Sequence, residues 1–521
     1  MLATLLSATL VALDGRVIRV EVDVAPGLPG FTIVGLGDAS IREARERVRG
    51  ALRNSGFVHP PRRITVNLAP ADVPKTGSAA DLAIAIGILI GSEQFTARAG
   101  RAALFGEVSL GGEIRTVPGL LPMVAAISRR GVRRVIVPAD GLDEARLVEG
   151  VEIVPARTVS DAVDALRSRP RAAPTPPARM ELAPTASGSA APAPISLAPP
   201  MAAPDLADVR GQLEARRALE VALAGGHGLL MIGPPGTGKT MLARTIPALL
   251  PPLSDEEALA ATVVASVSGE GPLHALVRTP PFRAPHHTSS YAAIVGGGRG
   301  LNPGEVTRAD NGVLFLDELA EFSRDVLEAL RQPLEDGRVT IVRASGAATL
   351  PARFQLVAAT NPCPCGHFGD EDRCACPTGV PDRYVGRISG PLRDRIDVWV
   401  TLARMKAAAM VSGPEPESSA VVAERIAGAR ARQKARLGGR LNARIGGRAL
   451  RVMAGLNQIT TRHLADLADS ERLSGRGTER LLRVARTVAD LEDAAAVELQ
   501  HLEEAARWRP PSSRPPVALA V

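Results

Sequence analysis

The sequence is poor in aromatic residues: its 521 positions include two Trp, two Tyr and nine Phe. Small and aliphatic side chains therefore supply most of its 45% hydrophobic content, a share typical of a folded globular protein. Long apolar runs are missing as well. The longest, LAIAIGILIG at Leu82–Gly91, is about half of the ~20 residues that a membrane-spanning helix needs. We therefore expect no membrane span.

The N-terminal stretch MLATLLSATLVAL is apolar but lacks the marks of a secretory leader. It has neither basic residues ahead of it nor a small-residue cleavage motif behind it. Asp14 and Gly15 follow, and then the alternating run RVIRVEVDV. This pattern predicts a β-hairpin with its tight turn at Asp14-Gly15. We expect a cytoplasmic protein.

Cysteine is nearly absent: the chain has four, and all of them lie between residues 363 and 376. In the cytoplasm, four clustered thiols bind a metal more often than they form disulfides. The spacing C-x-C-x8-C-x-C offers enough soft ligands for a closed tetrahedral zinc site. Four free thiols are the alternative, and His367 could replace one cysteine as a ligand. We predict a structural zinc ion bound by Cys363, Cys365, Cys374 and Cys376.

A change of composition divides the chain. Residues 168–204 are dominated by Pro, Ala and Ser without an amphipathic period, which predicts a semi-extended linker. Residues 1–167 mix β-prone runs with helical patterns and predict an α+β or α/β domain. Residues 205–404 contain apolar strand-like runs separated by helical segments, the pattern of an α/β domain with a parallel sheet. Residues 405–510 are helical in pattern, and residues 511–521 form a tail.

The segment GPPGTGKT fits the pattern G-x-x-x-x-G-K-[ST] and lies between an apolar strand and a helix. Its glycines let backbone N–H groups face nucleotide phosphates, helped by the positive end of the following helix. Lys239 is expected to reach the β- and γ-phosphates, and the Thr240 hydroxyl to bind Mg²⁺. The predicted ATP-binding residues are Gly233, Pro234, Pro235, Gly236, Thr237, Gly238, Lys239 and Thr240.

The segment VLFLDE supplies a pair of acids after an apolar strand. Asp317 would hold the magnesium ion, and Glu318 would polarise the attacking water. A helix cap would explain one carboxylate after a strand, but not this pair together with the phosphate-binding segment. The sequence therefore predicts an ATP hydrolase.

These motifs resemble those of AAA+ ATPases, and longer ones resemble the Mg-chelatase-like ComM/YifB family. In chain order the longer motifs are FRAPHHTSSYAAIVGGG, PGEVTRADNGVLFLDEL, RQPLEDGRVTIVRA, ATNPCPCG and GRISGPLRDRIDV. The resemblance covers nearly the whole chain outside the linker. It implies a P-loop AAA+ parallel sheet with a helical lid. It also implies that Asn361 is the sensor-1 residue, which helps to orient the hydrolytic water.

The same resemblance implies an arginine finger at Arg395, which a subunit inserts into its neighbour's nucleotide site to neutralise transition-state charge. Arg393 and Arg387 are the alternatives for this role. Arg476 matches the sensor-2 arginine of the helical lid, and Arg480 is its alternative. Because a finger acts only across a subunit boundary, a homo-oligomeric ring is implied, and we expect a hexamer.

Residues 1–167 resemble the proteolytic domain of Lon, which has a ribosomal-S5-like fold. Lon-type chemistry needs a serine that is activated by a lysine. Here Ser78 lies one position early against the family pattern, and Leu121 occupies the place of the lysine. Lys75 is the nearby amine, but it lies in a different segment. We therefore expect an inactive domain that docks partners or stacks on the ring.

The run from Val421 to Arg451 contains eight Arg and one Lys against one Glu. It could contact phosphates, or it could be a solvated helix face or an inter-subunit surface. Because rings for base stacking are few, any contact with DNA is expected to be backbone-directed.

The ComM/YifB resemblance implies an ATP-driven helicase that moves branched or single-stranded DNA, with residues 331–344 as a β-hairpin in the pore. Two alternatives stay open. The first is a motor subunit of a chelatase, and the second is a chaperone-like remodeller of protein partners.

Overall fold

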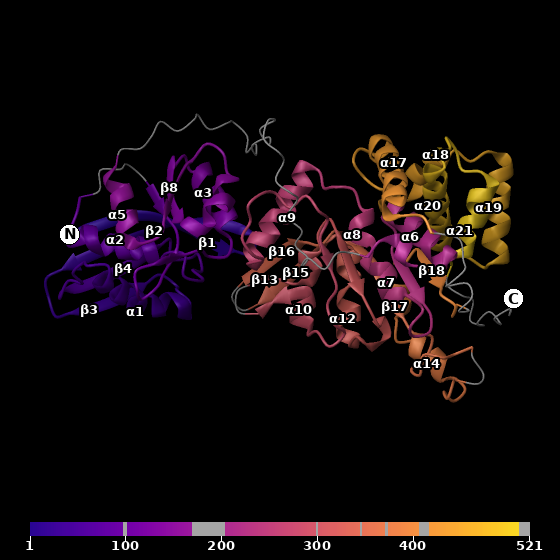
Figure 1. Cartoon of the computed structure of the whole chain (residues 1–521), viewed down its shortest axis with the longest axis horizontal. Helices are drawn as coiled ribbons and strands as arrows, with labels where there is room; N and C mark the ends of the chain where they lie inside the picture. The colour runs from indigo at the N-terminus through magenta and orange to yellow at the C-terminus, as the bar shows by residue number, and fades with distance from the viewer. Residues whose placement is uncertain are drawn as a thin grey trace.

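The computed structural model describes residues 1–96, 102–168, 204–298, 301–343, 346–369, 373–405 and 416–509. Figure 1 shows two bodies placed end to end, an N-terminal part (residues 1–168) and a C-terminal part (residues 204–509). The expected linker at 168–204 lies almost entirely outside the described residues, and so does the expected tail at 511–521.

The N-terminal part is built on a seven-stranded mixed sheet with the order β3-β4-β2-β1-β5-β8-β9. β2 pairs antiparallel with β1 and β4, and the other neighbours are parallel. Along β2 the side chains of alternate valines and isoleucines are buried, as a half-buried strand requires. The strands are β1 Leu2–Val11, β2 Asp14–Ala25, β3 Gly30–Val34, β4 Arg63–Ala69, β5 Ala102–Leu104, β8 Arg134–Pro138 and β9 Glu152–Ala156, with a separate pair β6 Glu107–Val108 and β7 Ile114–Arg115.

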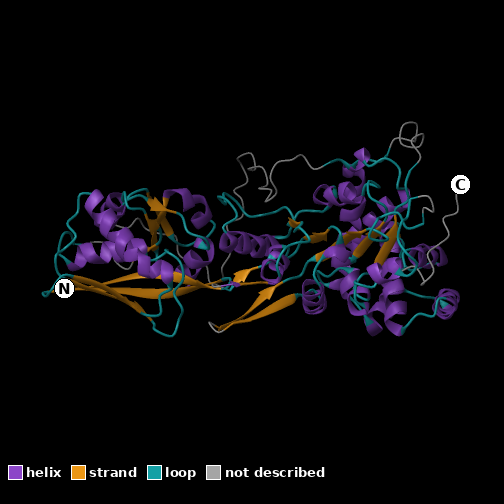
Figure 2. Ribbon diagram, turned by 90° about the horizontal axis from the view of Figure 1, so that it is seen from below, coloured by secondary structure: helices purple, strands orange, loops and turns teal. Residues whose placement is uncertain are grey.

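Figure 2 shows the helices of the N-terminal part gathered on one side of its long strands. The longest apolar run forms α2, which is almost wholly buried because it packs against β1, β2 and α1. The Asp38 side chain caps α1 by accepting a hydrogen bond from the N–H of Ile41. These elements confirm an α+β arrangement. The helices are α1 Ala39–Asn54, α2 Asp81–Gly91, α3 Leu120–Arg129, α4 Leu142–Arg146 and α5 Val159–Arg167.

The predicted N-terminal hairpin is present, but the expected position of its turn is wrong. β1 and β2 pair as far as Val11 and Asp14, so the turn consists of Ala12 and Leu13. Ala12 takes the left-handed conformation that the turn needs, with φ of 56°. Gly15 lies inside β2, where a Cβ atom would collide with the Pro122 carbonyl oxygen of α3. Gly15 therefore serves close packing, and its turn-like signal misleads.

The C-terminal part contains a five-stranded parallel sheet with the order β11-β14-β17-β10-β18. β10, β14 and β17 are completely buried, which explains their uninterrupted apolar sequences. Parallel strands place all their carboxyl ends at one edge, and the loops leaving that edge form the site described below. The strands are β10 Leu229–Ile232, β11 Phe282–Arg283, β14 Val313–Leu316, β17 Gln355–Thr360 and β18 Val398–Thr401.

Helices pack around this sheet, and the last third of the chain is helical as expected. α17 and α20 pack on α6, so that the helical region shares one hydrophobic core with the sheet. The helices before β18 are α6 Leu213–Gly225, α7 Lys239–Arg244, α8 Ile246–Leu249, α9 Asp255–Ser268, α10 Tyr291–Val295, α11 Glu305–Arg308, α12 Arg324–Ala329, α13 Arg331–Asp336, α14 Val380–Val385 and α15 Gly390–Arg393. Those after it are α17 Ser419–Leu437, α18 Gly447–Ala454, α19 Gln458–Ser470, α20 Gly475–Leu491 and α21 Leu499–Arg507.

The hairpin expected at residues 331–344 begins later in the chain. Residues 331–336 form helix α13, which ends at Gly337 in the left-handed conformation. The hairpin itself consists of β15 (Arg338–Arg343) and β16 (Gly346–Pro351), paired antiparallel from Arg338–Pro351 to Arg343–Gly346. A shorter pair, β12 (Gly296–Gly297) and β13 (Asn302–Pro303), lies nearby and contacts β15.

The two parts touch through apolar and polar contacts. Ala12 and Leu13, at the tip of the N-terminal hairpin, pack against the hydrophobic core of the C-terminal part. The Ser266 hydroxyl of α9 donates to Glu144 at 2.6 Å, and the Gly119 N–H donates to the Ser266 carbonyl oxygen at 2.8 Å. Burial raises the pKa of Glu144. Within the described ranges, no helix is both long enough and apolar enough to cross a membrane.

Candidate functional site

Three loops meet at the carboxyl edge of the parallel sheet. Residues 233–240 follow β10, Asp317 and Glu318 follow β14, and Asn361 follows β17. β17 lies between β10 and β14, so its loop joins the other two. The parallel register thus brings together residues that are more than a hundred positions apart in the sequence.

The loop after β10 has the backbone that its glycines allow. Gly236 and Gly238 have φ of 78° and 91°, in the left-handed region that favours glycine. A Cβ atom on either would meet nothing within 4 Å, so the requirement is conformational and not one of space. The Thr237 hydroxyl donates to the Pro234 carbonyl oxygen at 2.9 Å and closes the loop. α7 then begins at Lys239, directly after Gly238.

The Lys239 ammonium group lies inside this loop. Its Nζ donates to the carbonyl oxygens of Gly233 at 2.6 Å and Pro234 at 2.9 Å, and to the Asn361 side-chain oxygen at 3.2 Å. Burial lowers the pKa of Lys239, and the negative charges of Asp317 and Glu318 oppose this effect. Lys239 and Asn361, predicted separately from two motifs, are therefore in direct contact.

Thr240 and Asp317 form the second contact across the edge. The Thr240 hydroxyl donates to Asp317 Oδ2 at 2.6 Å, and the other Asp317 oxygen accepts from the Glu318 N–H at 3.0 Å. A hydroxyl oxygen beside a carboxylate is the hard oxygen set that magnesium prefers when it also binds phosphates. The residues present therefore fit a magnesium ion, and Thr240 and Asp317 would hold it.

Glu318 has a left-handed backbone with φ of 53°, which is uncommon for a residue other than glycine. Its Oε2 lies 3.0 Å from His287 Nδ1. The His286 ring lies beside His287, with ring centroids 4.1 Å apart. Since β11 runs parallel to β14, the residues that follow β11 reach the same edge as Glu318. Strain of this kind often occurs at functional positions.

The contact with His287 was not foreseen from the sequence. The motif FRAPHHTSSYAAIVGGG contained the signal, because two histidines follow the two-residue strand Phe282–Arg283 in it. Only the pairing of β11 with β14 puts them beside the second acid of VLFLDE. A histidine in this position can hold the Glu318 carboxylate in one orientation.

Arg395 lies at the opposite edge of the sheet. The N–H groups of Asp397 and Val398 both donate to the Gly228 carbonyl oxygen, and Gly228 directly precedes β10. Arg395 is thus near the amino end of β10, and the four residues of that strand, about 13 Å long, separate this edge from the phosphate-binding loop. The Arg395 guanidinium instead pairs with Glu335 at 2.8 Å.

Arg476 lies in the first turn of α20 and is exposed. The Arg395 hydrogen bond and charge lower the pKa of Glu335, and the charge of Arg476 adds to this effect. Arg395 and Arg476 are therefore neighbours of one carboxylate. Both belong to a surface away from the phosphate-binding loop of their own chain.

The alternative arginines have partners of their own. Arg480 Nη2 donates to the Asp394 carbonyl oxygen at 3.1 Å, and its side chain is mostly buried. Arg387 pairs with Glu321 at 3.4 Å, and the Arg393 guanidinium lies 5.4 Å from the centroid of the Trp399 ring. These contacts lie within the chain and favour structural roles for the three.

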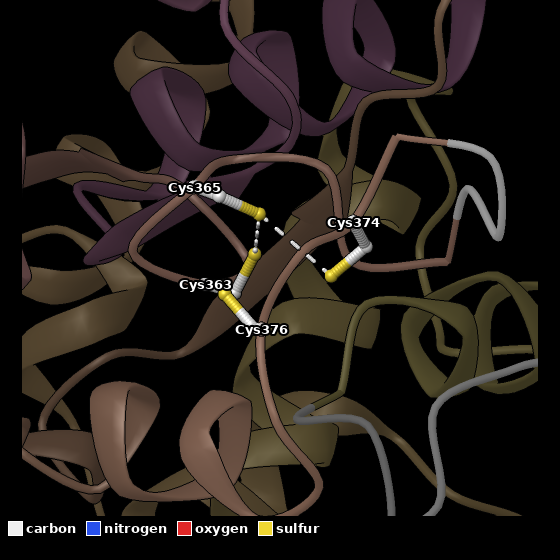
Figure 3. Close-up of side chains that lie close together, drawn as sticks. All are labelled: Cys363, Cys365, Cys374 and Cys376. Carbon is white, nitrogen blue, oxygen red and sulfur yellow. Dashed lines mark hydrogen bonds between the residues drawn. The ribbon is translucent and has the colours of Figure 1, made fainter.

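The four cysteines form one cluster, drawn in Figure 3. Their sulfur atoms all lie within 4.8 Å of one another. The sulfur of Cys365 is 3.3 Å from that of Cys363 and 3.7 Å from that of Cys374. The backbone N–H of His367 lowers the pKa of the Cys365 thiol to about 6, which favours a thiolate. His367 thus contributes its backbone, and the group that could hold a metal consists of cysteines.

The cysteine cluster adjoins the phosphate-binding loop. Cys363 follows Asn361 by two positions and is buried. A Cβ atom on Gly366 would lie 2.7 Å from Pro235 Cδ, so the two loops are packed against each other. The cysteine cluster therefore lies in the segment that leaves β17, and this segment packs against the one that leaves β10.

Comparison with known proteins agrees with this geometry. The profile described as magnesium chelatase, subunit ChlI, matches residues 205–410. Residues 20–141 match subunit ChlI of Mg-chelatase, and residues 416–509 match the ChlI C-terminal profile. YifB of Escherichia coli is 43% identical over 498 residues, 94% of each chain. The competence protein ComM of Haemophilus influenzae is 40% identical over 511 residues, 98% of this chain and 97% of ComM. The chain belongs to the Mg-chelatase-like ComM/YifB family.

A shorter similarity reaches beyond the ComM/YifB family. A DNA replication licensing factor, the MCM3 homolog 1 of Zea mays, is 30% identical over 168 residues. That stretch is 32% of this chain and 19% of the maize protein. The name of this shorter relative refers to DNA replication.

In this member of the ComM/YifB family, Ser78 and Lys75 contact different partners. The Ser78 hydroxyl donates to the Glu107 carboxylate, and the Lys75 ammonium group donates to the Pro70 carbonyl oxygen. Leu121, at the lysine position of the Lon resemblance, is buried within α3. The arrangement provides no lysine base for Ser78 among the contacts of the described residues.

The first half of the basic run at 421–451 makes contacts within the chain. Arg425 pairs with Glu220 at 2.6 Å and with Glu417 at 2.8 Å. Arg436 pairs with the buried Asp490 at 2.8 Å. Burial lowers the pKa of Arg430 to about 10. The second half differs, because Arg440, Arg444, Arg448 and Arg451 are exposed.

Proposed function

We propose that this ComM/YifB-family protein is a AAA+ ATPase that hydrolyses ATP to remodel DNA, as a ring-shaped branch-migration helicase would. The observation that carries the first half is the convergence of Lys239 with Asn361 and of Thr240 with Asp317 at one sheet edge. Each pair joins two separate motifs, which a structural turn without a ligand does not require.

ATP binding would use the backbone N–H groups of residues 233–240 together with Lys239. The ammonium group, now hydrogen-bonded to loop carbonyl oxygens, would turn to the β- and γ-phosphates. Magnesium held by Thr240 and Asp317 would neutralise the charge on those phosphates. Glu318 would orient and polarise the attacking water, and Asn361 would fix its position.

The position of Arg395 and Arg476 supports action between subunits. Both lie away from their own phosphate-binding loop, so they are suited to complete the site of a neighbour. We therefore propose a homo-oligomeric ring, with six subunits. Arg395 would act as the finger and Arg476 as the sensor-2 arginine.

Mixing two inactive variants tests this arrangement. Lys239→Ala removes the phosphate contact from one chain, and Arg395→Ala removes the finger from another. If the site is shared, a mixture of the two recovers part of the ATPase activity, since some interfaces combine an intact Lys239 with an intact Arg395. A mixture as inactive as either variant alone contradicts a shared site.

DNA is proposed as the substrate because ComM is named a competence protein and the maize relative a DNA replication factor. The test is ATPase activity with and without branched or single-stranded DNA over a salt series. Stimulation that fades as salt rises is expected, because phosphate contacts release counterions. If DNA does not stimulate the ATPase activity, a chelatase motor or a chaperone-like remodeller becomes the better supported function. The names of the matched families favour the chelatase motor.

A structural zinc ion is proposed for the cysteine cluster. Four thiols within 4.8 Å of one another suit the tetrahedral sulfur set of zinc, and four protein ligands leave no position for a reacting water. The ion would fix the loop that adjoins Asn361 and Pro235. We also propose a cytoplasmic location, where such thiols stay reduced.

A further inference from the structure

The N-terminal part contains a basic cleft that the proposed ATPase mechanism does not use. It has a volume of about 360 Å³ and lies between α1, the segment 29–31 and the segment 59–62. Four arginines line it, whereas Glu46 is the single carboxylate in the lining. The arginines are Arg45, Arg49, Arg53 and Arg62.

The three arginines of α1 form a line along one face of the helix. They are spaced by four residues, so consecutive guanidinium groups start about 6 Å apart and the line extends about 12 Å along the axis. All four arginines of the cleft are exposed. Arg45 donates to the backbone oxygens of Arg42 and Phe31. Within the part of the chain that the structure describes, none of the four forms an ion pair.

His59 supplies a second, independent observation. Its Nε2 is buried and has no hydrogen-bond partner among the described residues. The His59 ring lies 6.1 Å from the Phe31 ring, at the wall of the cleft. Burial, together with the charges of Arg49 and Arg53, lowers the pKa of His59. The wall of the cleft thus carries a polar atom whose hydrogen-bonding capacity is unused by the described residues.

We propose that this cleft binds the sugar–phosphate backbone of a nucleic acid strand. A single phosphate would occupy one or two guanidinium groups, but a line of three with Arg62 beside it fits a series of phosphates. Guanidinium forks suit the oxygens of successive phosphates. The proposal rests on the DNA-remodelling function and adds to it a contact outside the ATPase core.

The test is binding of a fluorescein-labelled single-stranded oligonucleotide to the full chain, measured by anisotropy over a salt series. Arg49→Ala/Arg53→Ala removes two charges from the cleft. The matched control, Arg130→Ala/Arg133→Ala, removes two exposed arginines from the end of α3 and the following turn. Figure 1 places α3 far from α1 in the same part of the molecule.

We expect the cleft variant to bind roughly tenfold more weakly at low salt, and the control to change by less than about twofold. The slope of log K against log salt should fall by about 1.4 in the cleft variant, from about 0.7 per lost phosphate contact. Arg49→Lys/Arg53→Lys keeps both charges and should retain most of the affinity. ATPase activity without DNA should stay unchanged in every variant, which also reports that they fold.

Equal losses in the cleft variant and the control would overturn the proposal, because net charge would then explain both. Wild-type affinity in the cleft variant would overturn it while leaving the DNA function intact. A wild-type chain that binds no DNA would overturn both. Poly-glutamate of equal charge that competes as well as unlabelled oligonucleotide would assign the cleft to acidic peptides and overturn its assignment to nucleic acid.

Discussion

Two groups of arginines, one in each part of the molecule, differ in whether carboxylates pair with them. In the C-terminal part, Arg283 pairs with Glu270 and Glu305, and Arg425 with Glu220 and Glu417. In the N-terminal cleft, Arg49, Arg53 and Arg62 lie exposed without ion pairs among the described residues. The contrast teaches that a high density of arginine says little about binding. What counts is whether carboxylates from other elements reach the guanidinium groups.

The largest expected effect separates the two parts by chemistry. Glu318→Gln keeps the size of the side chain but removes the base, so we expect kcat to fall by about 10² to 10⁴-fold while ATP still binds. Arg49→Ala/Arg53→Ala should leave turnover without DNA as it is. Steady-state ATPase assays and nucleotide binding measure both. Normal turnover by Glu318→Gln would refute the assignment of the base.

The next effect concerns paired against unpaired arginines. Asp490→Ala leaves Arg486 buried without its partner, since their side chains are 1% and 2% exposed and lie 2.9 Å apart. We expect a loss of about 3–5 kcal/mol in the free energy of unfolding of the C-terminal part. Arg49→Ala should change the free energy of unfolding of the N-terminal part by less than about 0.5 kcal/mol. Urea denaturation compares the two variants. Asp164→Ala, which removes the exposed ion-pair partner of Arg167, is the surface control. Similar shifts in all three would erase the contrast.

Metal content sharpens the comparison further, because all the cysteines lie in the C-terminal part. Metal analysis of purified protein should find about one zinc ion per chain. Removing it with a chelator should lower ATPase activity, because the loop beside Asn361 and Pro235 would lose its anchor. DNA binding at the N-terminal cleft should persist. A folded sample without zinc would end this proposal.

The smallest effect is expected at His287. Its Nδ1 is 3.0 Å from Glu318 Oε2, so His287→Ala should let the carboxylate turn and lower kcat by about tenfold with little change in KM. His287→Gln keeps a hydrogen-bond donor and should retain more of the activity. Kinetics over a range of ATP concentrations separate kcat from KM. A rise in KM alone would indicate a role in nucleotide binding instead.

The convergence of three loops at one sheet edge could be predicted from the sequence because each loop follows an apolar strand. Lys239, Asp317 and Asn361 needed only the rule that loops after parallel strands share an edge. His287 was missed because the pairing of β11 with β14 is a tertiary fact, and β11 has only two residues. Gly15 misled because a residue that suits a turn was required for packing against α3.

The basic surfaces were harder to predict for a related reason. The run at 421–451 has one Glu of its own, but Glu220 and Asp490 from distant segments and Glu417 from just before the run pair with it. α1 has five arginines against two glutamates, and its sequence does not show which guanidinium groups stay unpaired. In the structure Arg47 pairs with Asp81 at 2.7 Å, while the cleft arginines form no ion pair among the described residues.

The β1–β2 hairpin gives the molecule a mechanical link. Its ten paired residues extend over about 33 Å, with the tip at Leu13 embedded in the C-terminal core. The same β2 pairs with β4, which leads back to the segment lining the basic cleft. A hairpin that is held at both ends would transmit a displacement from one part of the molecule to the other. Under the proposed function, a displacement of the ATPase core around Leu13 would tilt the arginine line together with the proposed bound strand.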